Sequence, residues 1–124
     1  MIKSIEEVED FLREVHKRLK DSKENLYIVV KKGKDKTNEF RVMYNISSEI
    51  VCEELLKLDI SNYSYTDYDD SQKYPNEEVW IFGQILSIPG VLRFEEIYIK
   101  LKIRNNVVCM SFHPKEFDIT YPYN

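Results

Sequence analysis

The chain has 124 residues, of which 43% are hydrophobic and 13% aromatic, so it can bury one core but is too short for two ordinary domains. Its formal net charge of -4 argues against a protein that coats nucleic acid by bulk attraction, because such proteins usually carry a basic balance. We therefore expect a single domain over residues 1–124, with any nucleic-acid contact confined to a local basic patch.

The N-terminal sequence predicts a cytoplasmic protein. Charged side chains begin at the third residue, and no continuous apolar stretch resembles a signal peptide or a membrane span. Cys52 and Cys109 are far apart in the sequence. In a reducing compartment, two such thiols favour free cysteines over a disulfide or a thiolate metal site. No metal and no cofactor are expected.

The first quarter of the chain predicts a helix, a strand and a turn. Ser4 and Glu7 have the spacing of a capping box, and apolar residues at helical spacing then predict a helix over residues 5–20. Residues 26–30 form a short apolar run that is typical of an interior strand. The lysine-rich residues 31–36 follow this run and predict a surface turn.

The middle of the chain predicts one further helix and a long loop. Ser47 or Ser48 can cap a helix that runs to about residue 57, whereas residues 40–43 give only a weak signal for a helical turn. Residues 61–76 are dense in Tyr, Asp, Ser and Asn and have no apolar period. We therefore expect a polar loop there, long enough to be functional.

The C-terminal half predicts a strand followed by a β-hairpin. Residues 78–86 are strand-like, and Pro89 with Gly90 predicts a turn. Residues 93–104 alternate between apolar and polar side chains, and residues 107–112 return as a last strand. The two asparagines between these strands predict a two-residue hairpin loop, because Asn tolerates the positive φ that such turns need.

Strand alternation assigns the hairpin side chains to two faces. Ile97, Ile99, Leu101 and Ile103 are expected to face the core, where they would meet Val108, Met110 and Phe112. With a two-residue loop, Arg104 pairs with Val107, Lys102 with Cys109, Lys100 with Ser111 and Tyr98 with His113. The predicted outward face then holds six polar residues: Tyr98, Lys100, Lys102, Arg104, Ser111 and His113.

This outward face has the side chains that metal-independent RNA cleavage needs. A histidine can transfer a proton, a phenol lies beside it, and cations can stabilise a phosphate that gains charge in the transition state. The same face also suits simple RNA binding, and Lys, Arg and Tyr are typical of any solvated face of an antiparallel sheet. Trp80 is most simply a core or sheet-face aromatic, although an exposed Trp80 would be able to stack on a base.

Two other charged segments have simpler interpretations. The lysines at residues 31–36 are more typical of a solvated loop than of a phosphate clamp, because no G-x-x-x-x-G-K pattern surrounds them. Asp67, Asp69 and Asp70 lack the glycine and glutamate spacing of a calcium loop. They are therefore predicted to lie in an unliganded polar loop.

Three segments together resemble the motility quorum-sensing regulator (MqsR) toxin family. They are EELLKLDISNYSY (53–65), EEVWIFGQIL (77–86) and EIYIKLKIRNNVVCMSFHP (96–114). The resemblance implies an α+β fold of the RelE-like type, in which a curved antiparallel sheet packs against two or three helices. It also implies a messenger-RNA-cleaving toxin of a toxin-antitoxin system, with or without dependence on the ribosome, and a cognate antitoxin protein as partner.

The resemblance also implies roles for individual residues. Tyr98 matches the family's active-site tyrosine, Lys100 matches the lysine two positions later, and His113 stands where better-known members have a lysine. The sequence departs from the family around Ser64 and at Ile81, where a lysine and a glutamine are expected.

Two functional hypotheses follow from these residues. The leading one is an endoribonuclease in which Tyr98 and His113 handle protons, Lys100 takes part in catalysis, and Lys102, Arg104 and Trp80 bind RNA. The alternative is a non-catalytic module that keeps the toxin-like fold and binds RNA or protein. Neither membrane nor DNA binding is expected.

Overall fold

One mixed sheet organises the described part of the chain, which comprises residues 1–71, 73–87 and 94–124 of this computed structural model. The predicted turn at Pro89 and Gly90 lies outside the described residues. Five strands appear in the spatial order β1-β5-β4-β3-β2, and only the β1–β5 pair is parallel. They are β1 (Leu26–Ile28), β2 (Tyr63–Tyr68), β3 (Glu78–Ser87), β4 (Phe94–Ile103) and β5 (Val107–Pro114).

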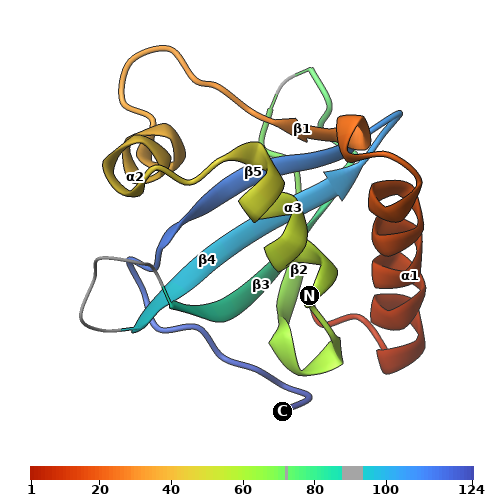
Figure 1. Cartoon of the computed structure of the whole chain (residues 1–124). Coiled ribbons are helices and arrows are strands. Elements are labelled where there is room, and N and C mark those ends of the chain that lie inside the picture. Colours follow the sequence, from red (N-terminus) through yellow and green to blue (C-terminus); the bar gives the residue numbers. More distant parts are fainter. Residues whose placement is uncertain (72, 88–93) are drawn as a thin grey trace.

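Three α-helices accompany this sheet in the described residues: α1 (Ile5–Asp21), α2 (Lys36–Tyr44) and α3 (Ser48–Leu56) (Figure 1). The α+β class is therefore confirmed, whereas the parallel edge strand β1 makes the sheet mixed rather than wholly antiparallel. Short 3-10 turns cover Lys23–Asn25 and Ile60–Asn62. No helix in the described segments is both long and apolar enough to cross a membrane.

The helix ends follow from local capping. Ser4 and Glu7 form the predicted capping box at the start of α1. Asp35 accepts a hydrogen bond from the Asn38 amide at the start of α2, and Asn45 ends this helix in the left-handed region at φ 55°. The weak helical signal at residues 40–43 therefore belongs to a full nine-residue helix.

The core lies between one face of the sheet and the helices α1 and α3. The fully buried Val8 and Val15 of α1 and Leu55 of α3 pack over Phe82 and Ile99 of the central strands. The predicted inward positions Ile97, Ile99 and Leu101 are buried here, and Ile103 packs at the margin. Both cysteines are buried free thiols.

The polar segment 61–76 is not the loop that its composition predicts. Tyr63–Tyr68 forms the edge strand β2, which pairs with β3. Tyr63 is fully buried among Trp80 and Phe82, and its hydroxyl lies 2.7 Å from that of the buried Thr66. The prediction was wrong because Tyr63 and Thr66 hydrogen-bond to each other inside the core. Their polar groups therefore need no contact with water, and a polar composition does not require this segment to be exposed.

The edge strand β1 also differs from expectation. The predicted interior strand over 26–30 is only three residues long and lies at the sheet edge, with Tyr27 half exposed. Because β1 pairs only with residues 107–109, the second half of β5 is left for another partner. That partner is α2, where the Thr37 hydroxyl accepts a hydrogen bond from the Phe112 amide at 3.0 Å.

The β4–β5 hairpin keeps the predicted pairing only at the end away from its loop. Ile103 pairs with Val107 and Lys102 with Val108, so the loop has three residues, and the asparagines in it do not adopt positive φ. A bulge between Lys100 and Leu101 on β4 and residues 109–111 on β5 then restores the predicted register. Tyr98 therefore faces His113, and Lys100 faces Ser111, as the sequence predicts.

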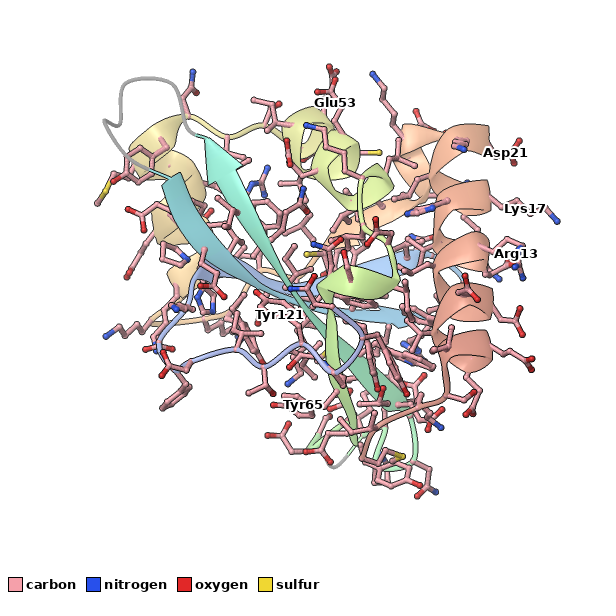
Figure 2. All side chains as sticks on the ribbon, turned by 90° about the horizontal axis from the view of Figure 1, so that it is seen from below. Arg13, Lys17, Asp21, Glu53, Tyr65 and Tyr121 are labelled. Atoms are coloured by element: carbon pink, nitrogen blue, oxygen red, sulfur yellow. The ribbon has the colours of Figure 1, made fainter. Side chains whose placement is uncertain are left out.

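The second face of the sheet is crossed by the C-terminal segment, residues 115–124. The Tyr121 hydroxyl donates a 2.7 Å hydrogen bond to Glu96 of β4, and the side chain lies against the strands, whereas Arg13 and Lys17 of α1 project away (Figure 2). Gly83 of β3 makes this approach possible, since a Cβ there would lie 2.1 Å from the Tyr121 hydroxyl oxygen.

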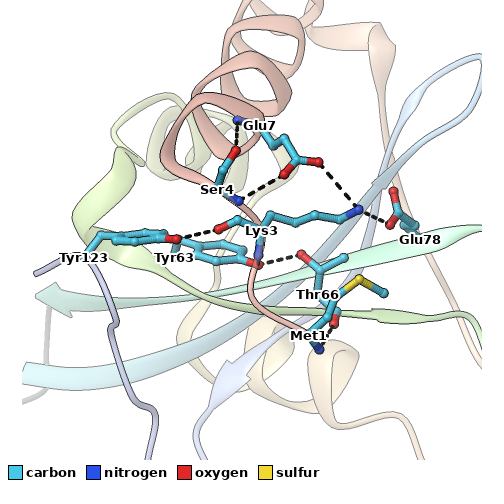
Figure 3. Close-up of polar contacts among 8 residues, drawn as sticks. All are labelled: Met1, Lys3, Ser4, Glu7, Tyr63, Thr66, Glu78 and Tyr123. Carbon is cyan, nitrogen blue, oxygen red and sulfur yellow. Dashed lines mark hydrogen bonds and ion pairs between the residues drawn. The ribbon is translucent and has the colours of Figure 1, made fainter.

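The end of this segment contacts the N-terminal residues. Tyr123 stacks on Tyr63 and donates a 2.6 Å hydrogen bond to the Lys3 carbonyl (Figure 3). Lys3 also forms an ion pair with Glu78 of β3, and the Met1 ammonium donates to the Thr66 carbonyl. Contacts between both ends of the described chain therefore close the edge of the sheet beside β2.

Candidate functional site

A cavity of about 370 Å³ opens where α2 and the preceding loop meet the second half of β5. Strands β2, β4 and β5 supply its floor through Tyr65, Tyr98, Ser111 and His113. The rest of the lining comes from the loop, α2 and the C-terminal segment: Lys31, Lys34, Lys36, Thr37, Glu116 and Phe117. The hydrogen bond from Phe112 to Thr37 fixes the lysine-rich loop beside this floor.

Tyr98 and His113 lie side by side at the centre of the cavity. Their ring centroids are 5.6 Å apart, on directly paired positions of β4 and β5. The His113 Nδ1 atom lies 2.9 Å from the Pro114 carbonyl oxygen. Since a carbonyl only accepts, Nδ1 carries the hydrogen, and the lone pair of the neutral ring lies on Nε2. This contact prepares Nε2 to accept a proton.

Tyr98 is held in its protonated form. Burial, together with the nearby Tyr65 hydroxyl and Asp67 carboxylate, raises the pKa of Tyr98 to about 12. A phenolate would be poorly solvated there and would face another negative charge. The phenol is therefore suited to donating a proton or a hydrogen bond, and not to acting as a base near neutral pH.

The cations at the cavity come from a segment that the sequence assigned to a solvated loop. Lys36 forms an ion pair with Glu116, whereas Lys31 and Lys34 are exposed and form no ion pair with any described residue. The backbone amide of Lys31 donates to Asp35, which fixes the turn. Sequence pattern alone missed this role, because it depends on where α2 docks against β5.

Two residues of the predicted basic face lie just beyond the cavity. Lys100 is partly buried opposite Ser111, outside the cavity lining. Lys102 was expected in solvent but is 6% exposed, and its ammonium lies 2.6 Å from the buried Asp69 carboxylate and 3.2 Å from Glu77. The segment after β2 folds over Lys102 and removes it from the accessible surface, so its predicted contact with RNA does not fit its position.

Arg104 and Trp80 also lie away from Tyr98. Arg104 is six residues along the chain, roughly 20 Å at the usual strand rise, and it pairs with Glu77 and stacks on Tyr74. Trp80 is 8% exposed and stacks on Phe11 at 4.3 Å, on the helix-covered face of the sheet. The structure therefore places neither residue at the cavity, and Trp80 offers no free face to a base.

The site so defined is a basic cavity lined by a tyrosine and a histidine, on the face of the sheet opposite α1 and α3. Among the described residues, no group of three or more His, Cys, Asp or Glu side chains is arranged to hold a metal ion. No protein-family model, curated protein or solved structure matches the chain. The chemistry of the site therefore has to be argued from its own residues.

Proposed function

We propose that this protein is a metal-independent endoribonuclease whose active site is the cavity around Tyr98 and His113. The observation that carries the proposal is that a proton donor, Tyr98, lies beside a proton acceptor, His113. The Nε2 atom of His113 is free to accept a proton, and Tyr98 retains its proton well above neutral pH. Lys31 and Lys34, two exposed lysines that form no ion pair with any residue the structure describes, line the same cavity.

The reaction that fits these groups is attack by the ribose 2′-hydroxyl on the adjacent phosphorus. His113 Nε2 takes the 2′-hydroxyl proton as the new P–O bond forms. The bond to the 5′-oxygen breaks, and Tyr98 donates its proton to that leaving oxygen. The products are a 2′,3′-cyclic phosphate and a 5′-hydroxyl. Lys31 and Lys34 stabilise the charge on the phosphate, and Lys100 is positioned for the phosphate of a neighbouring nucleotide.

Within this proposal the protein is a cytoplasmic toxin of the MqsR and RelE-like type, and its partners are messenger RNA and a cognate antitoxin. The Lys31 to Lys36 loop attracts an acidic partner segment, because oppositely charged surfaces steer association. An antitoxin that covers this loop would also block the cavity.

The second candidate function is a binding module that uses the same cavity without chemistry. Ser64 and Ile81 stand where the resembling family has a lysine and a glutamine, and the loss of these two side chains favours the binding module. Such a module would bind RNA through the same lysines and leave it intact.

Cleavage of labelled single-stranded RNA and of the matching DNA separates the two functions. The endoribonuclease cleaves RNA only, with and without EDTA, because DNA lacks the 2′-hydroxyl. His113→Ala should reduce the cleavage rate by about 10² to 10⁴ fold while RNA binding changes little. The matched control is His16→Ala, because His16 contacts the Leu55 carbonyl on the helix-covered side. Equal cleavage of DNA, or an active His113→Ala variant, would contradict the proposal.

A further inference from the structure

A second cavity adjoins the proposed active site. It has a volume of about 250 Å³ and lies between the sheet and the C-terminal segment. Tyr65, Tyr98 and Phe117 line both cavities, so the two spaces share an aromatic wall. A ligand that places a phosphate beside Lys31 and Lys34 can therefore extend directly into the second space.

The walls of this second cavity suit a flat, apolar ring. Ile81 of β3 and Ile119 of the C-terminal segment add aliphatic surface to the aromatic residues. Phe117 is 81% exposed, which is unusual for a phenylalanine that lines a cavity, and its ring is available for stacking. Stacking on aromatic side chains is the usual way in which proteins hold unpaired bases.

Three polar residues, Ser64, Asp118 and Thr120, also line this cavity, and Ser64 is the buried one among them. Ser64 is 2% exposed and lies at the irregularity where β2 shifts register against β3. Its hydroxyl forms no hydrogen bond with any described residue, in contrast to the hydroxyls of Tyr63 and Thr66, which bond to each other. A bulge re-aims a side chain. Here the bulge turns the Ser64 hydroxyl toward the cavity, whereas the other buried hydroxyls of β2 are hydrogen-bonded within the protein.

We propose that the second cavity binds the nucleobase next to the scissile phosphate, stacked against Phe117 and Tyr65 and hydrogen-bonded to the Ser64 hydroxyl. This inference rests on the proposed function and names its substrate as unpaired RNA, because a base in a duplex cannot enter. The volume of about 250 Å³ lies just below the usual range for ligand pockets, roughly 300–1,000 Å³, which suits one base and not a larger group. Ser64 supplies base preference, and the aromatic wall supplies affinity.

Binding of the four nucleoside 3′-monophosphates, compared with inorganic phosphate, tests the proposal without any cleavage. The nucleotides should bind at least about tenfold more tightly than phosphate, the size of effect that one base stack supplies. Phe117→Ala should remove most of this advantage and leave phosphate affinity unchanged. Ser64→Ala should change the ranking of the four bases. The matched control is Ile85→Ala, because Ile85 is 66% exposed on the same face of the sheet but lines neither cavity.

Equal affinity for nucleotides and phosphate, absence of any nucleotide binding, or equal effects of Phe117→Ala and Ile85→Ala would overturn the base site. The outcome is separable from that of the proposed function. RNA cleavage by a protein that does not distinguish nucleotides from phosphate would contradict only the base site. Nucleotide selectivity in a protein that leaves RNA intact would contradict only the endoribonuclease.

Discussion

At the scale of single residues, the proton on Tyr98 and the lone pair on His113 Nε2 determine what the cavity can do. The two side chains are neighbours, yet burial and the nearby Tyr65 and Asp67 keep Tyr98 protonated, while the Pro114 carbonyl directs the lone pair of His113 to Nε2. Under the proposed function, these surroundings give Tyr98 the role of the acid and His113 the role of the base.

Tyr98→Phe should lower the cleavage rate by about 10² fold, and by the same factor at every pH between 6 and 10. The reason is that a pKa of about 12 keeps Tyr98 protonated across this whole range. Single-turnover rates of wild type and variant over this range check it. Tyr68→Phe is the control, because Tyr68 is 55% exposed and lines neither cavity. A ratio that falls to about half its value near pH 10 would mean that Tyr98 ionises at the ordinary phenol pKa of 10.0.

At the scale of elements, a buried ion pair attaches the segment after β2 to the strand β4. Burial alone would raise the pKa of Asp69, but the Lys102 ammonium, the Ser71 amide and the charge of Lys100 outweigh it, and the pKa is lowered. Burial likewise opposes the charge on Lys102, but hydrogen bonds from this ammonium to Asp69 and Glu77 raise its pKa. Both partners are therefore charged between their ordinary pKa values of 3.8 and 10.5.

Lys102→Ala should lower the free energy of unfolding at pH 7 by about 3 kcal/mol, because it leaves the Asp69 carboxylate buried without its cation. Arg104→Ala should cost much less, since its pair with Glu77 is partly exposed. Urea denaturation of both variants measures the difference.

The effect of Lys102→Ala should also depend on pH in one direction. Because the folded-state pKa of Asp69 is depressed, the stability that it contributes is present above 3.8 and is lost as the pH falls through the folded value. The gap between wild type and Lys102→Ala should therefore shrink in acid. A gap of the same size at pH 7 and pH 3 would show that the ion pair is not its cause.

The same elements explain how far the sequence could predict the fold and the site. Regular alternation in β4 identified Tyr98 as an outward residue, and its pairing with His113 was correct although the loop was not. Lys102 occupies an equivalent outward position, but a later segment covers it, and alternation alone cannot detect such a cover. The role of Lys31 and Lys34 depends on the packing of α2 against β5, a contact between distant parts of the chain that leaves no periodic signal.

At the scale of the whole molecule, the segregation of charge matters more than its sum. The formal charge is -4, yet the cavity has a rim of lysines, and Asp69 and Glu77 in the segment after β2 are paired with Lys102 and Arg104. RNA is therefore expected to approach along the lysine-rich loop. This approach has a measurable salt dependence, because each phosphate contact releases condensed counterions.

Lys34→Ala should weaken RNA binding and reduce the slope of log affinity against log salt by about 0.7, the value for one phosphate contact with a single strand. Lys17→Ala is the charge-matched control, because Lys17 projects from α1 away from the sheet (Figure 2). Fluorescence anisotropy with a 2′-O-methylated RNA, at several salt concentrations, gives both slopes. Identical slopes for the two variants would place the RNA elsewhere on the surface.

The hairpin between β4 and β5 contains two irregularities whose effects on the strand register cancel. Its loop is one residue longer than the simplest turn, and the bulge near Leu101 absorbs that residue before the strands reach Lys100 and Tyr98. The tip of the hairpin can therefore gain or lose a residue during divergence, provided that the bulge adjusts, without moving His113 from its place opposite Tyr98. In related sequences, insertions and deletions should therefore be more frequent at this tip than between the bulge and His113.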